Sequence, residues 1–283
     1  MASTVSVTVP AEVLARRALM QGGTGAVVVL LGCQSKLIYY PNPYPAKQLR
    51  DFAGRGGREL RFTTPGGTQV AHWLPPMAGS PGGRLWIVCA GNGSLALDWV
   101  DICAKADRSA GWLFVDYPGY GECQGKPAPD TIRANIVGAV GALAAELGTS
   151  RAALEPRLAA FGHSLGAAAA LIAAEEFQLK RLVLLSPFTS MTEMGKIVLG
   201  RPLCYLNLHR YDNRARLRAI APLGPQIDLF HGTADDSIPL RMSEELAATW
   251  PQSITLHRVS GGGHNDLPNL AESRIQAALN RRE

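Results

Sequence analysis

Short apolar segments recur along the chain, and each is followed by a turn or by apolar residues at helical spacing. The segments lie at residues 84–90, 112–116, 157–161, 181–185, 226–230 and 254–259. Continuous apolar strands that alternate with helices are buried on both faces, which is typical of a parallel sheet covered by helices. The alternation therefore predicts an α/β fold with a mostly parallel central sheet and helices on both faces.

Two further segments, residues 60–64 and 68–74, flank the turn Pro65-Gly66-Gly67 and predict a hairpin at an antiparallel edge of this sheet. Helical patterns occupy residues 97–106, 130–147 and 267–279. Asp130 is the expected N-cap of the second helix. Because no internal repeat or low-complexity linker interrupts the pattern, we expect one domain from about Tyr40 to the C-terminus.

The composition excludes several classes of protein. The 283 residues are 47% hydrophobic and 18% charged, which excludes a disordered chain. The net charge is +5, but no run of Lys or Arg is long enough to predict a nucleic-acid-binding face. The five cysteines show neither a CxxC pair nor zinc-ligand spacing, so no metal site is predicted. Cys89 lies in an apolar strand and is expected to be a buried small hydrophobic residue.

The N-terminus has the pattern of a targeting segment. Arg16 and Arg17 precede residues 18–35, which contain no charge, and the apolar core at residues 26–31 ends in Gly32-Cys33. A basic region followed by a short apolar region is typical of a secretory signal. Cys33 directly after Leu-Leu-Gly resembles a bacterial lipobox, and the arginine pair resembles a weak twin-arginine signal. An uncleaved anchor or a helix packed on the domain are the alternatives.

These observations predict that residues 1–33 are a signal peptide or a membrane or lipid anchor. We therefore expect the protein to be exported or membrane-associated, as a bacterial envelope lipoprotein that carries lipid on Cys33. Membrane association would then run through the N-terminus.

Residues 162–166 read Gly-His-Ser-Leu-Gly and lie between an apolar strand and an Ala-rich helix. In open α/β sheets, ligands bind at the carboxyl ends of the strands. A G-x-S-x-G turn at such an end strains the serine backbone and exposes its hydroxyl. Ser164 is therefore the candidate nucleophile.

Two other strand ends offer a carboxylate and an imidazole. Asp235 and Asp236 follow the strand at residues 226–230, and His264 follows three glycines after the strand at residues 254–259. A triad acid orients the imidazole and stabilises its charged form, while the imidazole acts as general base and then as acid. We assign these roles to Asp235, with Asp236 as the alternative, and to His264.

The strand at residues 84–90 ends in Gly91-Asn92-Gly93. Backbone N–H groups of such a turn can bind an oxyanion. The candidate donors are Asn92, with Gly93 as the alternative, and Leu165, the residue after the nucleophile. A plain tight turn is the other interpretation of the glycines.

The chain order Ser164, Asp235, His264 is that of α/β-hydrolases. From residue 38 to residue 283 the chain resembles this superfamily. It is most similar to the lidless serine aminopeptidase-like subgroup, which includes membrane-tethered depalmitoylating thioesterases. The matching motifs are Leu37-Ile38-Tyr39-Tyr40-Pro41, Asp116-Tyr117-Pro118-Gly119-Tyr120-Gly121, Ser186-Pro187-Phe188-Thr189-Ser190, Tyr211-Asp212-Asn213 and Gly263-His264-Asn265-Asp266. One departure is Ala90-Gly91, where many members have His-Gly.

The resemblance implies an α/β-hydrolase fold with a small or absent cap and a serine hydrolase without a cofactor. The expected substrates are acyl esters or thioesters, cleaved through an acyl-enzyme. Between Ser190 and Gln226 we expect one or two small helices over an apolar cleft. A small-peptide aminopeptidase is an alternative, although no acidic residue to hold a substrate amine is evident. A catalytically inactive envelope-binding lipoprotein and an acyltransferase are the others.

Overall fold

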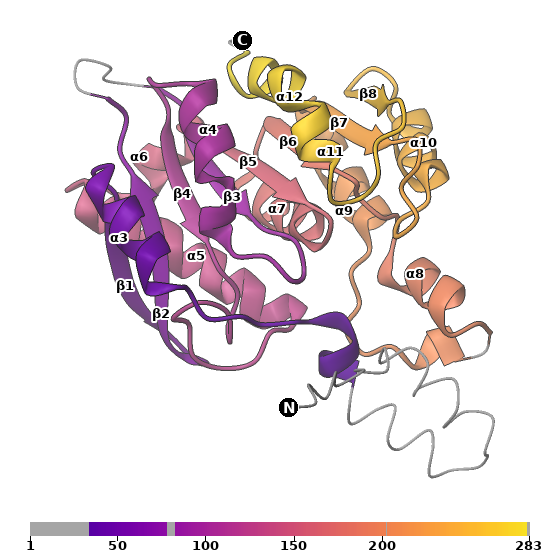
Figure 1. Cartoon of the computed structure of the whole chain (residues 1–283), viewed down its shortest axis with the longest axis horizontal. Coiled ribbons are helices and arrows are strands. Elements are labelled where there is room, and N and C mark those ends of the chain that lie inside the picture. The colour runs from indigo at the N-terminus through magenta and orange to yellow at the C-terminus, as the bar shows by residue number, and fades with distance from the viewer. Residues whose placement is uncertain (1–33, 78–82, 202, 282–283) are drawn as a thin grey trace, which may run out of the picture.

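The computed structural model describes residues 34–77, 83–201 and 203–281 and has a sheet with strand order β1-β2-β4-β3-β5-β6-β7-β8 (Figure 1). The strands are β1 Arg58–Thr64, β2 Gly67–Leu74, β3 Leu85–Cys89, β4 Gly111–Val115, β5 Leu158–His163, β6 Arg181–Leu185, β7 Gln226–Gly232 and β8 Ile254–Val259. Strands β3 to β8 are parallel, whereas β2 is antiparallel to both β1 and β4. The predicted parallel sheet and its antiparallel edge are both confirmed.

Alternate side chains of each inner strand enter separate apolar layers. In β3, Leu85, Ile87 and Cys89 pack into one layer, while Trp86 and Val88 pack into the other. A strand must be apolar at every position when both of its faces are covered. The continuous apolar runs in the sequence therefore arise because each inner strand is covered by an apolar layer on both faces.

Helices cover both faces of the sheet (Figure 1). Their bounds are α3 Ala46–Gly54, η1 Ala96–Trp99, α4 Val100–Ala106, α5 Pro129–Glu146, α6 Arg151–Leu154, η2 Glu155–Arg157, α7 Leu165–Phe177, α8 Met191–Val198, η3 Leu203–Leu206, α9 Asn213–Ile220, η4 Ala221–Leu223, α10 Leu240–Thr249, α11 Leu267–Leu270 and α12 Glu272–Leu279. Helices α5, α7 and α10 contribute to one layer, and α3, α4 and α12 contribute to the other.

Two details of the helix predictions are wrong. Helix α5 begins at Pro129 with Ala128 as its N-cap, so Asp130 lies inside the first turn. Proline suits this first position because its fixed φ is already helical, and the Thr131 hydroxyl accepts the free Ala128 N–H at 2.9 Å. The predicted helix at residues 267–279 is two helices, because Ala271 departs from helical dihedral angles.

The segment between Ser190 and Gln226 forms short helices, as expected, and no large cap. Helix α8 and the turn η3 lie together, and α9 packs against α7 instead. No residue of α8 is fully buried. This small cap leaves the carboxyl edge of the sheet accessible.

Cys89, Cys103, Cys123 and Cys204 are free thiols and are buried. The prediction for Cys89 is therefore confirmed. The predictions for residues 1–33, including Cys33, lie outside the described residues. Within the described ranges, no helix combines the length and the apolar character that a membrane crossing requires.

A buried ion pair joins the C-terminal helix to the sheet. The Arg181 guanidinium, in β6, donates to Asp228 Oδ2 at 2.6 Å and to the Ala278 carbonyl at 2.6 Å. His257 Nε2 lies 2.6 Å from the other Asp228 oxygen. Burial opposes the charge of Asp228, but the hydrogen bonds from His257 and Arg181 outweigh it and lower the pKa of Asp228. The pair thus links β6, β7, β8 and α12.

Replacing Arg181 with Met should lower the free energy of unfolding by about 3 kcal/mol, because Asp228 loses its buried cation and keeps only His257 and the half-exposed Arg281 among the described residues. Urea unfolding followed by tryptophan fluorescence measures this loss. Lys47→Ala removes an exposed ion pair to Asp51 and serves as the control, with essentially no change expected. Equal unfolding midpoints for Arg181→Met and wild type would contradict the role of the pair.

Candidate active site

Ser164 is the single residue between β5 and α7, and its backbone dihedral angles are ones that residues other than glycine rarely adopt. Its φ is 57° and its ψ is −118°. The Ser164 N–H donates to the Leu185 carbonyl of the neighbouring strand at 2.8 Å. A non-glycine residue in this conformation is held there by its surroundings. The strained turn predicted from G-x-S-x-G is present.

The two glycines of the motif are required by packing. A Cβ on Gly162 would lie 2.1 Å from the Gly166 carbonyl oxygen, and a Cβ on Gly166 would lie 2.1 Å from the Cys89 oxygen. Real Cβ atoms do not approach backbone oxygens this closely. Because Gly162 and Gly166 have no Cβ atom, α7 can begin directly against β5 and β3.

Of the two neighbouring aspartates, Asp235 is the one bonded to the candidate base. His264 Nδ1 lies 2.8 Å from Asp235 Oδ2. The Ile238 N–H donates to Asp235 Oδ1 at 2.8 Å. Asp236 is exposed and accepts only the Ser237 hydroxyl among the described residues, at 3.2 Å. The geometry therefore assigns the pairing with His264 to Asp235.

Asp235 is held in its charged form. Burial alone raises the pKa of a carboxyl, but His231, His264 and the Ile238 N–H together lower the pKa of Asp235 well below its usual value. His231 Nε2 lies 3.4 Å from Asp235 Oδ2 and 2.8 Å from the Ile238 carbonyl. His231 thus supports the acid loop, as its position at the start of that loop suggests.

The loop that carries His264 is fixed against the acid loop. The Ala234 N–H donates to the Gly262 carbonyl at 2.9 Å. A Cβ on Gly232 would lie 2.1 Å from that same carbonyl oxygen, so the two loops meet through bare backbone. The Gly263 N–H donates to Asp266 Oδ1 at 2.6 Å. The imidazole is therefore placed by backbone contacts rather than by a free loop.

His163 also supports His264, a contact that the sequence pattern did not predict. Its Nε2 lies 3.1 Å from the His264 carbonyl oxygen, and the two rings are 4.9 Å apart. Burial, together with the neighbouring His264, lowers the pKa of His163 to about 3, so this imidazole is neutral and donates to the carbonyl. Its one signal in the sequence is the position before Ser164 in the motif.

The candidate oxyanion donors also lie in this region. Asn92 follows β3, Leu165 opens α7, and both line the same cleft as Ser164 and His264. Within the described residues, neither the Asn92 N–H nor the Leu165 N–H has a hydrogen-bond acceptor. Two free backbone donors beside a serine are suited to binding developing negative charge.

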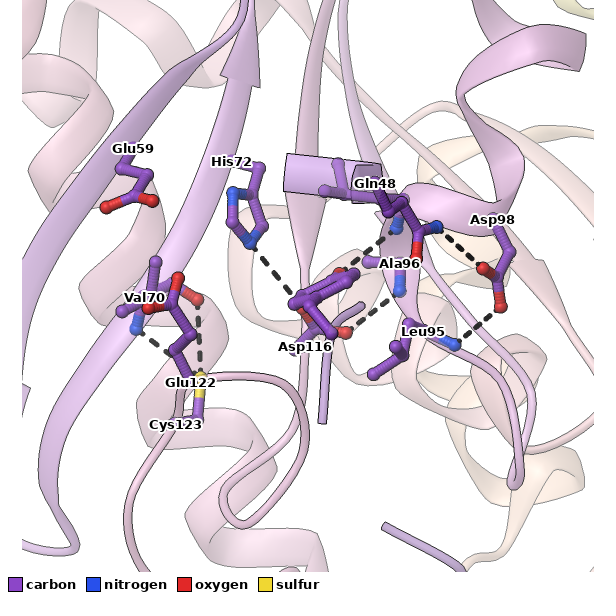
Figure 2. A network of polar contacts seen from close by, with 12 residues as sticks. Gln48, Glu59, Val70, His72, Leu95, Ala96, Asp98, Asp116, Glu122 and Cys123 are labelled. Atoms are coloured by element: carbon purple, nitrogen blue, oxygen red, sulfur yellow. Dashed lines mark hydrogen bonds and ion pairs between the residues drawn. The ribbon is translucent and has the colours of Figure 1, made fainter. Parts of the chain in front are cut away.

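The loop after β3 is braced by a buried carboxylate, shown in Figure 2. Asp116 Oδ1 accepts the Ala96 N–H at 2.8 Å, and Oδ2 accepts the Tyr44 hydroxyl at 2.5 Å. The Tyr117 hydroxyl donates to the Ala90 carbonyl at 2.6 Å. Asp116 and Tyr117 open the Asp-Tyr-Pro-Gly-Tyr-Gly motif, and together they hold both ends of the loop that carries Asn92.

Asp116 has an unusual environment for a carboxylate. Burial raises the pKa of Asp116 to about 6, although Tyr44 and the Ala96 N–H lower it in part. The neighbouring His72 cannot neutralise it: the His72 ring lies 3.9 Å from Asp116 Oδ2, and burial lowers the pKa of His72 to about 4. Within the described residues, the brace therefore contains a buried carboxyl group without a charged cation beside it.

The cleft in front of Ser164 has a volume of about 850 Å³, within the range of small-molecule sites. Its polar wall contains Ser164, His264, Asn92 and Asp236. Its apolar wall comes from residues 34–40, from Phe188 at the edge of the core and from the small cap. These residues are Leu37, Ile38, Phe188, Met191, Met194, Ile197, Val198, Leu199 and Leu203. Because the cap residues line the cleft, they are accessible from it and are not enclosed in the hydrophobic core.

No protein-family model matches the chain. The uncharacterized protein Rv2307c of Mycobacterium tuberculosis is 31% identical to it over 260 residues, which cover 92% of this chain and 90% of that protein. The chain belongs to the family of this mycobacterial protein.

Solved structures show the fold. An esterase of Pyrococcus furiosus is similar with a TM-score of 0.63 at 16% identity, covering 86% of this chain and 97% of that one. A lidless α/β serine hydrolase of Xanthomonas campestris gives a TM-score of 0.54 at 16% identity, covering 84% of this chain and 96% of that one. The chain has the α/β-hydrolase fold, with a small cap, as predicted.

Asp116 generates a pH test. Its raised pKa means that the folded state binds the proton more tightly than the unfolded state, so its contribution to stability falls as pH rises from about 4 to about 6. Asp116→Asn keeps the acceptor for Ala96 without the charge. Relative to wild type, we expect the variant to gain roughly 1–3 kcal/mol of unfolding free energy between pH 4 and pH 7.5.

The measurement is urea unfolding of both proteins across this pH range. Asp98→Asn is the matched control, because Asp98 accepts the Leu95 N–H on the same loop but is exposed. A difference between Asp116→Asn and wild type that stays constant with pH would refute a buried, charged Asp116.

Proposed function

We propose that the protein is a serine hydrolase that cleaves carboxylic esters or thioesters of acyl substrates, with Ser164, His264 and Asp235 as its catalytic triad. One observation carries the proposal: a serine on a strained strand-to-helix turn shares a cleft with an imidazole that is bonded to a buried carboxylate. The α/β-hydrolase fold of the chain supports the same chemistry.

The reaction follows from these positions. With its Nδ1–H donated to Asp235, His264 has a free Nε2 that takes the proton of the Ser164 hydroxyl as Ser164 Oγ attacks the acyl carbonyl. The Asn92 and Leu165 N–H groups stabilise the oxyanion. His264 then protonates the leaving alkoxide or thiolate, and water, deprotonated by His264, releases the acid from the acyl-enzyme.

The apolar wall supports an acyl chain as the part of the substrate that the cleft binds. Met191 and Met194 pack partly against the core and line the cleft. Methionine side chains adapt to flexible apolar ligands. A series of p-nitrophenyl esters and matching thioesters of increasing chain length tests this, with kcat/KM expected to rise with the chain until the wall is filled.

Asp236 favours a second candidate, a small-peptide aminopeptidase. This exposed carboxylate lines the cleft and could bind a substrate amine, a feature that the sequence did not make evident. Hydrolysis of amino-acyl amides that is lost in Asp236→Asn, with esters of fatty acids unaffected, would favour this candidate over the first.

Fluorophosphonate labelling of the full chain tests the nucleophile. Wild type should label strongly, and Ser164→Ala and His264→Ala should not. Ser94→Ala, which removes another serine of the same cleft, should label like wild type. A folded wild-type protein that does not label would instead support an inactive binding lipoprotein.

The two aspartates provide a matched pair. Asp235→Asn should lower kcat/KM for the best ester by roughly 10³–10⁴-fold, because the imidazole loses its orienting charge. Asp236→Asn should lower it less than about tenfold, since only weak substrate contacts change. Comparable losses in both variants, measured by steady-state kinetics, would remove the assignment of Asp235.

For residues 1–33 we propose export and lipid attachment at Cys33. In a bacterial host fed an alkyne fatty acid, wild type should incorporate the label and reach the membrane fraction, whereas Cys33→Ser should do neither. Cys204→Ser, which alters a buried thiol, is the control. Full labelling of Cys33→Ser would exclude this attachment site.

A further inference from the structure

Two segments distant in the sequence form one edge of the cleft mouth. Gln34 Nε2 donates to the Leu206 carbonyl at 2.7 Å, and Gln34 Oε1 accepts the Leu208 N–H at 2.7 Å. His209 adds hydrogen bonds to Ser35 at 3.1 Å and to Tyr39 at 3.2 Å. In Figure 1 the short helix at residues 34–38 lies beside the chain that follows α8. The start of the described chain is thus fixed beside the small cap.

This edge is unusually apolar for a surface. Eight large apolar side chains are exposed in the described part of the chain, and five of them belong to these two segments. They are Tyr40, Ile197, Val198, Tyr205 and Leu208, here called the rim. Leu208 is 67% exposed and Tyr205 is 55% exposed, while Tyr40, Ile197 and Val198 also line the cleft. Exposed apolar groups that cluster in this way mark a contact surface.

The same two segments are basic. Residues 34–42 and 194–211 contain Lys36, Lys196, Arg201 and Arg210 and no Asp or Glu. Lys196 pairs with Glu193, but Lys36, Arg201 and Arg210 are exposed and have no ion-pair partner within the described ranges. A surface with exposed aromatic and aliphatic side chains and unpaired cations is complementary to anionic lipid.

We propose that the rim docks on an anionic lipid bilayer, with its apolar side chains at the boundary between headgroups and acyl chains and its cations on the lipid phosphates. The position of the N-terminus supports this occupant. The first 33 residues of the sequence precede Gln34, which is fixed at this edge, and residues 18–35 of the sequence contain no charge. Whether or not that segment is anchored, the rim supplies a separate contact from the domain itself.

Docking in this way places the mouth of the cleft against the lipid. Tyr40, Ile197 and Val198 belong both to the rim and to the cleft wall, so an acyl chain can pass from the bilayer toward Ser164 without crossing water. This consequence rests on the proposed function, whereas the docking itself does not.

Tryptophan quenching by brominated phospholipids tests the contact in the full chain. Leu208→Trp places a probe on the rim. Leu147→Trp is the matched control, because Leu147 is exposed at the end of α5, next to the amino ends of the parallel strands. Both variants keep the native tryptophans as a common background. The vesicles contain phosphatidylcholine, with or without phosphatidylglycerol.

On vesicles with phosphatidylglycerol, Leu208→Trp should be quenched and Leu147→Trp should not. Combining Lys36→Gln, Arg201→Gln and Arg210→Gln should lower the vesicle affinity, measured by titrating this quenching with lipid, roughly fivefold for each cation removed, and high salt should act in the same direction. Hydrolysis of a soluble short ester should stay unchanged, since none of these cations lines the cleft. Quenching is measured without any substrate, so its outcome is independent of the proposed activity.

Three results would overturn the proposal. Equal quenching of both tryptophans on vesicles that sediment with the protein would mean that only the N-terminal segment binds lipid. A Leu208→Trp emission that is shifted to the blue without vesicles and changes with protein concentration would assign the rim to a second copy of the chain. The same shift without concentration dependence would assign it to residues 1–33 of the same molecule.

Discussion

The contact that the rest of the molecule depends on is the close backbone packing of α7 against β5 and β3 around Ser164. Helix α7 begins against β5 and β3 only because Gly162 and Gly166 carry no side chains. The same contact holds Ser164 at a positive φ and turns its hydroxyl toward the cleft. Packing at the centre of the sheet and the geometry of the candidate nucleophile are therefore one constraint, and neither can change without the other.

Around this centre, buried charges are few and each has a structural task. Arg181 and Asp228 join the last helix to the sheet, Asp235 orients His264, and Asp116 braces the loop of Asn92. Burying a charge is costly unless hydrogen bonds or an opposite charge compensate for it. Three of these groups are compensated by ion pairs or several hydrogen bonds. Among the described residues, the Asp116 carboxylate accepts hydrogen bonds from two neutral donors, and its pKa rises accordingly.

Local patterns in the sequence were enough to predict the strands, the turn at Ser164 and the positions of Asp235 and His264 at strand ends. In a parallel sheet these features follow from residues that are close in the sequence. The pattern favoured Asp235 but left Asp236 as the alternative, because the choice between them depends on a loop that folds back from residue 264. The brace at Asp116 and the contact of Gln34 with Leu206 and Leu208 join segments far apart in the chain, and no periodicity encodes them. The prediction of Asp130 as the N-cap was wrong because α5 already begins at Pro129, whose fixed φ suits the first helical position.

The turn at Ser164 also has a consequence for the folding of the chain. Its conformation requires β3, β5 and β6 to be paired, and the loop of His264 rests on β7 and the acid loop. Residues from 85 to 264 must all be in place before the proposed nucleophile and base can meet. An incompletely folded chain therefore lacks the proposed arrangement of Ser164 and His264, which forms only when β8 has joined the sheet.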